Sequence, residues 1–258
     1  RPDYAVDMLE VIKHVFDVEN VKVVLVTNTK QLRAAINHRY GMEVDAQKYL
    51  DKFLKYNFAL PDKIVAPFEM VQALVSVEYF KQLIRDGNLK GLIGQEITMD
   101  LISDLIERND LSLRETERLV RFLEIYHSLS GGLGKDVIWQ YVLLRITGVF
   151  IFCFYPNLMD DINKNRTDAG EFAQLFNLQS WPDMPDDPYY VKEVDVIAVM
   201  LILNSKIEDP RFILKEASEQ NSYWQARIAE NFGKGKMDLV LSILKETFRV
   251  LSFEQTPQ

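Results

Sequence analysis

The fold class of this chain depends on the stretch Val21-Lys-Val-Val-Leu-Val26, which is followed by Thr27 and Asn28. Five of its six residues are apolar, and four of these are β-branched. A short run of this kind is typical of a strand buried on both faces of a parallel sheet. Residues 31–39 then show helical spacing, and Thr29 is placed to cap that helix. The stretch therefore predicts a β-to-α unit.

The segments on either side extend this unit. Residues 6–16 and residues 45–55 carry apolar side chains at helical spacing. Residues 56–60 form a short apolar run that Pro61 ends, which predicts a second strand. We therefore expect residues 1–61 to form an α/β domain built on a parallel sheet.

Beyond Pro67 the apolar residues lie three and four positions apart, which predicts helices and no further strand. The clearest helix start is Ser112-Leu-Arg-Glu115, which matches a capping box, where the Ser and Glu side chains bond each other's backbone N–H groups. We expect a helical lid over residues 62–130 and a C-terminal helical region over residues 131–258 that binds a partner or acts as an effector. The predicted helices are residues 68–84, 99–107, 113–129, 136–154, 189–203, 211–219 and 237–251.

The composition is that of a globular protein, with 48% hydrophobic and 26% charged residues in a chain of 258. A formal net charge of −8 argues against direct nucleic-acid binding, which depends on clustered Lys and Arg. The single cysteine, Cys153, can form no internal disulfide, so we expect a reducing, cytoplasmic compartment. Residues 137–155 are strongly apolar, but Gln140 and Arg145 interrupt them, which favours a buried core helix over a membrane span.

Two loops resemble ligand-binding motifs but lack required groups. A phosphate loop here would need Gly at position 129 and Ser or Thr at position 136, where the chain has Leu129 and Asp136. A calcium loop starting at Asp161 would need Gly where Arg166 stands and Glu where Phe172 stands. We therefore expect no metal site, also because the three histidines are isolated in the sequence, namely His14, His38 and His127.

Several stretches resemble the KAP family of P-loop NTPases. They are residues 1–16, 21–28, 49–54 closing on 58–61, and 111–118, so that the resemblance covers roughly residues 1–130. It implies that residues 1–61 are the C-terminal half of a P-loop NTPase parallel-sheet core and that a helical lid follows. In that family the phosphate loop and the acidic Walker B strand precede the position of Arg1, so neither belongs to the residues shown.

The resemblance also implies an activity, that of an ATP-driven switch. ATP and Mg²⁺ would be the cofactors, with most of their ligands outside this chain, so this chain alone should not hydrolyse ATP. The family includes PifA-like and QatA-like ATPases of bacterial anti-phage defence as well as animal membrane scaffolds. We expect the defence branch, a protein partner or a homo-oligomer, and membrane contact only through segments not shown.

Two places carry the residues that the resemblance assigns to nucleotide sensing. Asn28, with Thr27 as the fallback, matches the position where a neutral polar side chain touches the γ-phosphate or orients the attacking water. The alternative for Asn28 is a turn residue that bonds its own backbone. Arg114 resembles the lid arginine that binds terminal phosphate oxygens. Its alternative is a surface ion pair with Asp110 or Glu117.

A third role concerns a neighbouring subunit. Lys52 is the first candidate for a cation that reaches the neighbour's nucleotide, and Lys48 and Arg39 are the others. The alternative is that they are ordinary cations on a helix face. The rival function for the whole chain is a non-catalytic helical adaptor or scaffold that binds a protein partner, because the acidic, helix-rich part after residue 61 contains no catalytic cluster.

Overall fold

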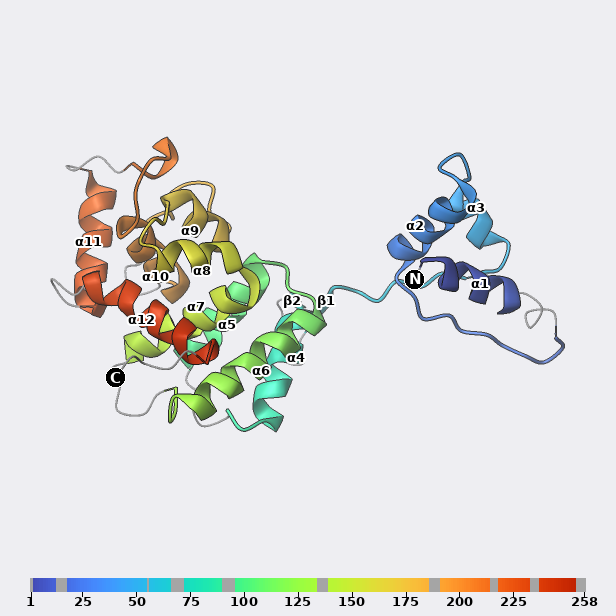
Figure 1. Ribbon diagram of the computed structural model, residues 1–258, viewed down its shortest axis with the longest axis horizontal. Helices are drawn as coiled ribbons and strands as arrows, with labels where there is room; N and C mark the ends of the chain where they lie inside the picture. Colours follow the sequence, from blue (N-terminus) through green and yellow to red (C-terminus); the bar gives the residue numbers. More distant parts are fainter. Residues whose placement is uncertain are drawn as a thin grey trace. The chain divides into compact units, whose positions relative to one another are not determined.

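The computed structural model describes residues 2–12, 18–54, 56–65, 72–89, 96–133, 139–185, 191–213, 218–232 and 237–253. Contacts divide the chain into two compact units, Arg1–Leu60 and Pro61–Gln258 (Figure 1). The first unit contains α1 (Pro2–Ile12), α2 (Thr29–Tyr40) and α3 (Ala46–Asp51). The second contains β1 (Lys63–Val65), β2 (Gln72–Leu74), α4 (Val75–Asp86), α5 (Glu96–Arg108), α6 (Leu113–Leu129), α7 (Trp139–Phe154), α8 (Pro156–Asn163), α9 (Ala169–Leu175), α10 (Glu193–Leu203), the 3₁₀ turn η1 (Pro210–Phe212), α11 (Glu219–Phe232) and α12 (Met237–Leu251).

The first unit is a small helical cluster. Helices α1 and α2 pack against each other, and α3 packs against α2. Two side-chain links join α1 to α2: Arg39 Nη1 lies 2.8 Å from Asp7 Oδ1, and the Tyr40 hydroxyl donates a hydrogen bond to Glu10. The core is small and consists of Val6, Leu9, Leu32, Ala35, Ile36, Ala46 and Leu50.

The predicted α/β fold is wrong for the described residues. Residues 21–28 form no strand, and Val24 and Val26 are 84% and 95% exposed. The described residues 56–60 also form no strand, and Phe58 is 86% exposed. A β-branched run becomes a buried strand only when neighbouring strands take its backbone hydrogen bonds, and the described residues provide none for it.

The sheet in the described residues is instead a short antiparallel pair in the second unit. Strands β1 and β2 pair with Lys63 opposite Leu74 and Val65 opposite Gln72. The expectation of a helix over residues 68–84 is wrong for 72–74, because β2 pairs with β1 and leads directly into α4. Residues 68–71 lie outside the described part of the chain.

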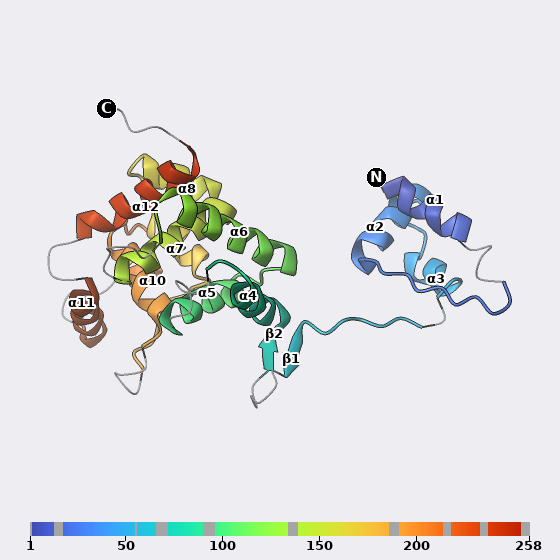
Figure 2. The ribbon, with the colours of Figure 1, turned by 90° about the horizontal axis from the view of Figure 1, so that it is seen from below.

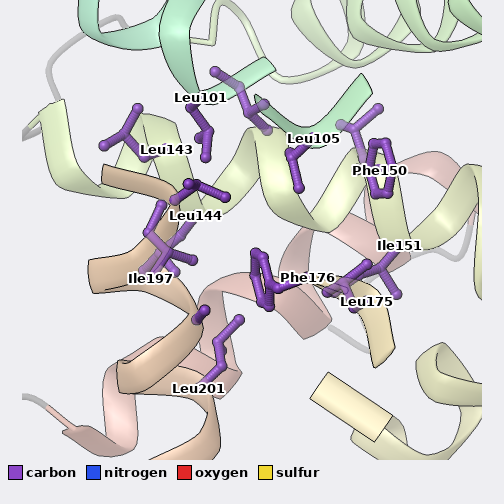
Figure 3. Packing of buried hydrophobic residues seen from close by; sticks show 14 of the residues in the cluster. Leu101, Leu105, Leu143, Leu144, Phe150, Ile151, Leu175, Phe176, Ile197 and Leu201 are labelled. Atoms are coloured by element: carbon purple, nitrogen blue, oxygen red, sulfur yellow. The ribbon is translucent and has the colours of Figure 1, made fainter. Parts of the chain in front are cut away.

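The second unit is a mainly helical body around one hydrophobic core. Helix α7 packs against α5, α6, α8 and α12, and α10 packs against α5, α9 and α11 (Figure 2). Figure 3 shows how Leu101 and Leu105 of α5 meet Leu144 and Phe150 of α7, with side chains from α9 and α10 below them. Eight of the eleven residues of α10 are buried, so this helix lies inside the body.

Most of the predicted helices are present. Helices α6 and α12 have the predicted bounds, and the Ser112–Glu115 capping box is confirmed. The helix expected over residues 211–219 is wrong: Pro210–Phe212 forms a 3₁₀ turn that the Asp209 side chain caps, and α11 begins at Glu219. Residues 214–217 lie outside the described part. No helix of the described residues is long and apolar enough to span a membrane.

Candidate functional site

Asn28 caps helix α2. Its Oδ1 accepts a hydrogen bond from the Gln31 backbone N–H at 3.1 Å. The cap is therefore Asn28 and not the predicted Thr29, which is the first helical residue. This oxygen therefore caps a helix. The Nδ2 group of Asn28 makes no hydrogen bond to a described residue, and Thr27 beside it is exposed. Contact of either residue with nucleotide stays a prediction.

The three candidate cations for a neighbouring subunit all lie in the first unit, but in different surroundings. Arg39 is bound to Asp7 and holds α2 against α1. Lys48 on α3 has an 84% exposed side chain, with its Nζ 4.0 Å from Asp45 Oδ2. Lys52 ends α3, and its Nζ lies 5.9 Å from the ring centroid of Tyr49. Lys48 and Lys52 are thus the candidates without a strong ion pair, and their role stays a prediction.

Arg114 lies in the first turn of α6 and is exposed. It makes no hydrogen bond or ion pair with any described residue. Glu117, one of its two expected surface partners, instead pairs with Arg121 at 3.2 Å. The carboxylate of Glu115 accepts hydrogen bonds from the hydroxyl and the backbone N–H of Ser112, and these bonds lower its pKa. The turn that carries Arg114 is therefore fixed, while the guanidinium is free.

The candidate residues are divided between the units. Asn28, Thr27, Arg39, Lys48 and Lys52 belong to the first unit, whereas Arg114 belongs to the second. Their convergence on one nucleotide stays a prediction.

Two cavities of the described residues lie away from these candidates. A cavity of about 430 Å³ opens at the end of α6, where Glu124, His127 and Phe253 contribute to its lining. His127 Nδ1 accepts a hydrogen bond from the Leu133 backbone N–H at 3.1 Å. A second cavity of about 290 Å³ lies beside α9 and is lined by polar residues such as Gln174 and Asn177. Neither cavity contains a predicted site residue.

The residues present do not fit a complete ATP–Mg²⁺ site. The chain contains no GxxxxGK[ST] stretch. Within the described residues no three His, Cys, Asp or Glu side chains gather in a way that could hold a metal ion. Burial raises the pKa of the Cys153 thiol to about 12, so this group is not a ready nucleophile.

No local pattern in the sequence predicts the polar cluster at the end of α5. Arg108 Nη2 lies 2.7 Å from Asp195 Oδ1 on α10, and the Tyr155 hydroxyl donates to Asn109 Oδ1 at 2.5 Å. Asn109 Nδ2 also donates to the Leu175 backbone oxygen at 3.1 Å. These partners are 46 to 87 positions apart, so no local pattern could have paired them. These contacts join α5, in the predicted lid, to the C-terminal helices.

The comparisons with known proteins support the resemblance. The family model described as the KAP family P-loop domain matches residues 1–130, which is 130 of 258 residues and thus just over half of the chain. Comparison with the curated proteins and with the solved structures found no match. The matched region ends at residue 130, inside the second unit. There α4, α5 and α6 share one core with the helices that follow. The chain therefore belongs to the KAP family of P-loop domains, a family of nucleotide-binding domains.

Proposed function

We propose that this chain is the nucleotide-responsive part of an ATP-driven switch, in which Arg114 binds the terminal phosphate of ATP. The observation that carries the proposal is the free guanidinium of Arg114 on a fixed helical turn. The proposal requires a phosphate loop and Mg²⁺ ligands from outside these 258 residues. Family membership supports nucleotide as the ligand class.

The position of Arg114 is electrostatically unusual. The first turn of a helix carries partial positive charge from its unpaired N–H groups, so a cation there is unfavourable by about 0.3–1 kcal/mol. Most helices place acidic residues at this point, and α6 does so with Glu115 next to Arg114. An anion bound at Arg114 would relieve this cost, and a guanidinium can grip two phosphate oxygens at once.

Movement of α6 would reach the rest of the second unit. Helix α6 packs against α4, α7 and α12, and its buried residues Leu119, Leu123 and Tyr126 belong to the common core. A displacement of Arg114 by the bound phosphate would therefore move α6 and, through the shared core, the C-terminal helices. On family analogy alone, we place this switch in bacterial anti-phage defence, in the cytoplasm, with a protein partner or further copies as its target.

The test compares Arg114→Ala with Arg121→Ala in the natural polypeptide that carries this chain. Arg121 is the matched control, because it lies on the same helix and is exposed but already pairs with Glu117. Arg114→Ala should lower ATP turnover about 10-fold or more without lowering the free energy of unfolding. Arg121→Ala should leave turnover within about twofold.

A second readout addresses the switch itself. ATPγS should slow hydrogen exchange of the first turn of α6 in the wild type and not in Arg114→Ala. The switch is refuted if the two arginine variants hydrolyse ATP equally well and ATPγS does not change the hydrogen-exchange rate of the first turn of α6 in the wild type. The helical adaptor then remains as the function of this chain.

A further inference from the structure

The connection between α5 and α6 is short and tightly folded. It consists of residues 109–112 alone. Its backbone closes the end of α5, because the Leu111 N–H donates to the Ile106 oxygen at 3.1 Å. Asp110 adopts the left-handed conformation that such a helix end requires, with a φ of 48°. A shift at the end of α5 therefore reaches the start of α6.

The side chain of Asn109 fastens this connection to distant parts of the second unit. Its Nδ2 donates to the Leu105 backbone oxygen at 2.9 Å and to the Leu175 backbone oxygen on α9 at 3.1 Å. Its Oδ1 accepts a hydrogen bond from the Tyr155 hydroxyl at 2.5 Å. These bonds use both N–H donors of the amide and one lone pair of its oxygen. Asn109 thus ties the connection to α9 and to the junction of α7 and α8.

Tyr155 is well suited to hold Asn109. Its ring packs against the core of the second unit, with its centroid 6.2 Å from that of Phe150. Burial raises the pKa of the Tyr155 hydroxyl above its ordinary value, so the group stays protonated and donates at neutral pH. The ring is fixed by packing, and the hydroxyl alone reaches Asn109.

The anchor of the connection lies outside the family domain. Asn109 and Arg114 belong to the region that the family model matches, whereas Tyr155 follows the end of that region. The ion pair between Arg108 and Asp195 crosses the same boundary. The matched lid is therefore held, next to its arginine, by helices that the family model does not cover.

We propose that Tyr155 and Asn109 are positioning residues for Arg114, through which the C-terminal helices regulate the response to nucleotide. This inference rests on the proposed function of Arg114. Arg114 lies two positions after the Ser112 cap and makes no ion pair with a described residue, so the path of the backbone through the connection sets where its guanidinium lies. A ligand of the C-terminal helices that breaks the bond between Tyr155 and Asn109 would change how Arg114 meets the terminal phosphate.

The first test needs no nucleotide. Tyr155→Phe removes the hydroxyl and keeps the ring, and it is made in the natural polypeptide that carries this chain. Hydrogen exchange of the backbone N–H groups of Asp110 and Leu111 should become about 2- to 10-fold faster, as expected when one hydrogen bond is lost. Exchange within α12 should keep its wild-type rate, which separates a local loosening from a general destabilisation.

The matched control is Tyr141→Phe. Tyr141 lies on α7 and is partly buried against the same core, and its hydroxyl makes no hydrogen bond with a described residue. Tyr141→Phe should leave the exchange of the connection and the ATP turnover at their wild-type values.

The second test is a double-mutant cycle on ATP turnover. Tyr155→Phe alone should slow turnover about 2- to 10-fold. It should slow turnover no further in a chain that already carries Arg114→Ala, because a positioning residue acts only through the group that it positions. A merely structural role of Tyr155 would give effects that add.

The outcomes separate this inference from the proposed function. Wild-type exchange at Asp110 and Leu111 in Tyr155→Phe would overturn the inference, as would additive effects in the cycle or an equal loosening of α12. If Arg114→Ala alone does not slow turnover, the proposed function fails and this inference fails with it. If Arg114→Ala slows turnover but Tyr155→Phe does not, this inference alone fails.

Discussion

At the scale of single residues, Glu115 is tied to the start of α6 by two hydrogen bonds. Its Oε2 accepts from the Ser112 hydroxyl at 2.7 Å and from the Ser112 backbone N–H at 2.9 Å. Both bonds favour the ionised carboxylate and lower the pKa of Glu115 below its ordinary value of 4.5. The resulting stability is complete above the unfolded-state pKa and is lost as the pH falls through the lower folded-state pKa.

Glu115→Gln tests this reasoning, because glutamine keeps the capping-box geometry and does not titrate. The wild type should exceed Glu115→Gln in free energy of unfolding by about 0.5–1 kcal/mol at neutral pH, a modest value because the group is exposed to solvent. The difference should shrink once the pH falls below 4.5. Urea unfolding of both proteins at several pH values measures it. A difference that is constant with pH would contradict the assignment. Ser112→Ala should lose only the part of the pH dependence that comes from the hydroxyl, because the backbone N–H at position 112 remains.

Asn28 stands at a position where two different roles need the same kind of side chain. The sequence placed it after an apolar run, where both a helix cap and a phosphate contact need a polar side chain. The structure assigns its Oδ1 to the cap of α2. The ion pair of Arg39 could not be predicted from the sequence, because its partner Asp7 lies 32 positions away. The absence of such a partner for Arg114 among the described residues depends on the tertiary structure in the same way.

At the scale of elements, α7 and α12 approach each other at a glycine. A Cβ atom at Gly148 would lie 3.0 Å from both Cβ and Cγ2 of Thr247, which is closer than side chains normally pack. A larger residue at 148 therefore requires the Thr247 side chain or the two helices to shift. Both residues are fully buried, so no solvent-facing rotamer is available to relieve the contact.

Gly148→Val should accordingly lower the free energy of unfolding by about 1–3 kcal/mol, despite the poor helix propensity of glycine. Thr247→Ala removes the opposing Cγ2 and should restore part of this loss when the two changes are combined. Urea unfolding of the two single variants and the double variant gives the coupling energy. Strictly additive effects would show that the two side chains do not compete for the same space.

Elements were predictable where one chain segment contains its own signals. Helix α6 has an apolar stripe and a capping box, and its predicted bounds are the observed ones. The run Val21–Val26 has the residue types of a buried strand, but a strand also needs a neighbour to which its backbone bonds, and the run itself cannot supply one. The turn at Pro210–Phe212 was mistaken for a helix because Arg211 to Glu219 has helical spacing, whereas the Asp209 cap produces only one 3₁₀ turn.

At the scale of the whole molecule, the predicted lid and C-terminal region share one core. The core cluster runs from Val77 to Leu251 without a break at residue 130. The ion pair between Arg108 and Asp195 crosses that position, and both side chains are only about one fifth exposed, at 20% and 18%. Breaking such a pair leaves one charge poorly solvated.

A polypeptide of residues 61–258 should therefore unfold in one cooperative transition. All three tryptophans lie after residue 130, so their fluorescence reports the C-terminal helices, while circular dichroism also reports α4, α5 and α6. The two midpoints in urea should coincide. Arg108→Ala should lower both by the same amount, equivalent to about 1.5–3 kcal/mol. If the fluorescence and circular dichroism midpoints differed, the lid would fold independently of the C-terminal region.

The sequence alone determined the family of the chain, the helical nature of the part after residue 61, and the bounds of helices such as α6 and α12. These features follow from local spacing, caps and short motifs, which act within one segment. Only the tertiary structure decided that residues 22–27 make no backbone hydrogen bond to a described residue, that Arg114 makes no ion pair with one, and that one core runs from Val77 to Leu251. Each of these depends on groups far apart in the chain, and the energy of such contacts is set by burial and by the choice of partner.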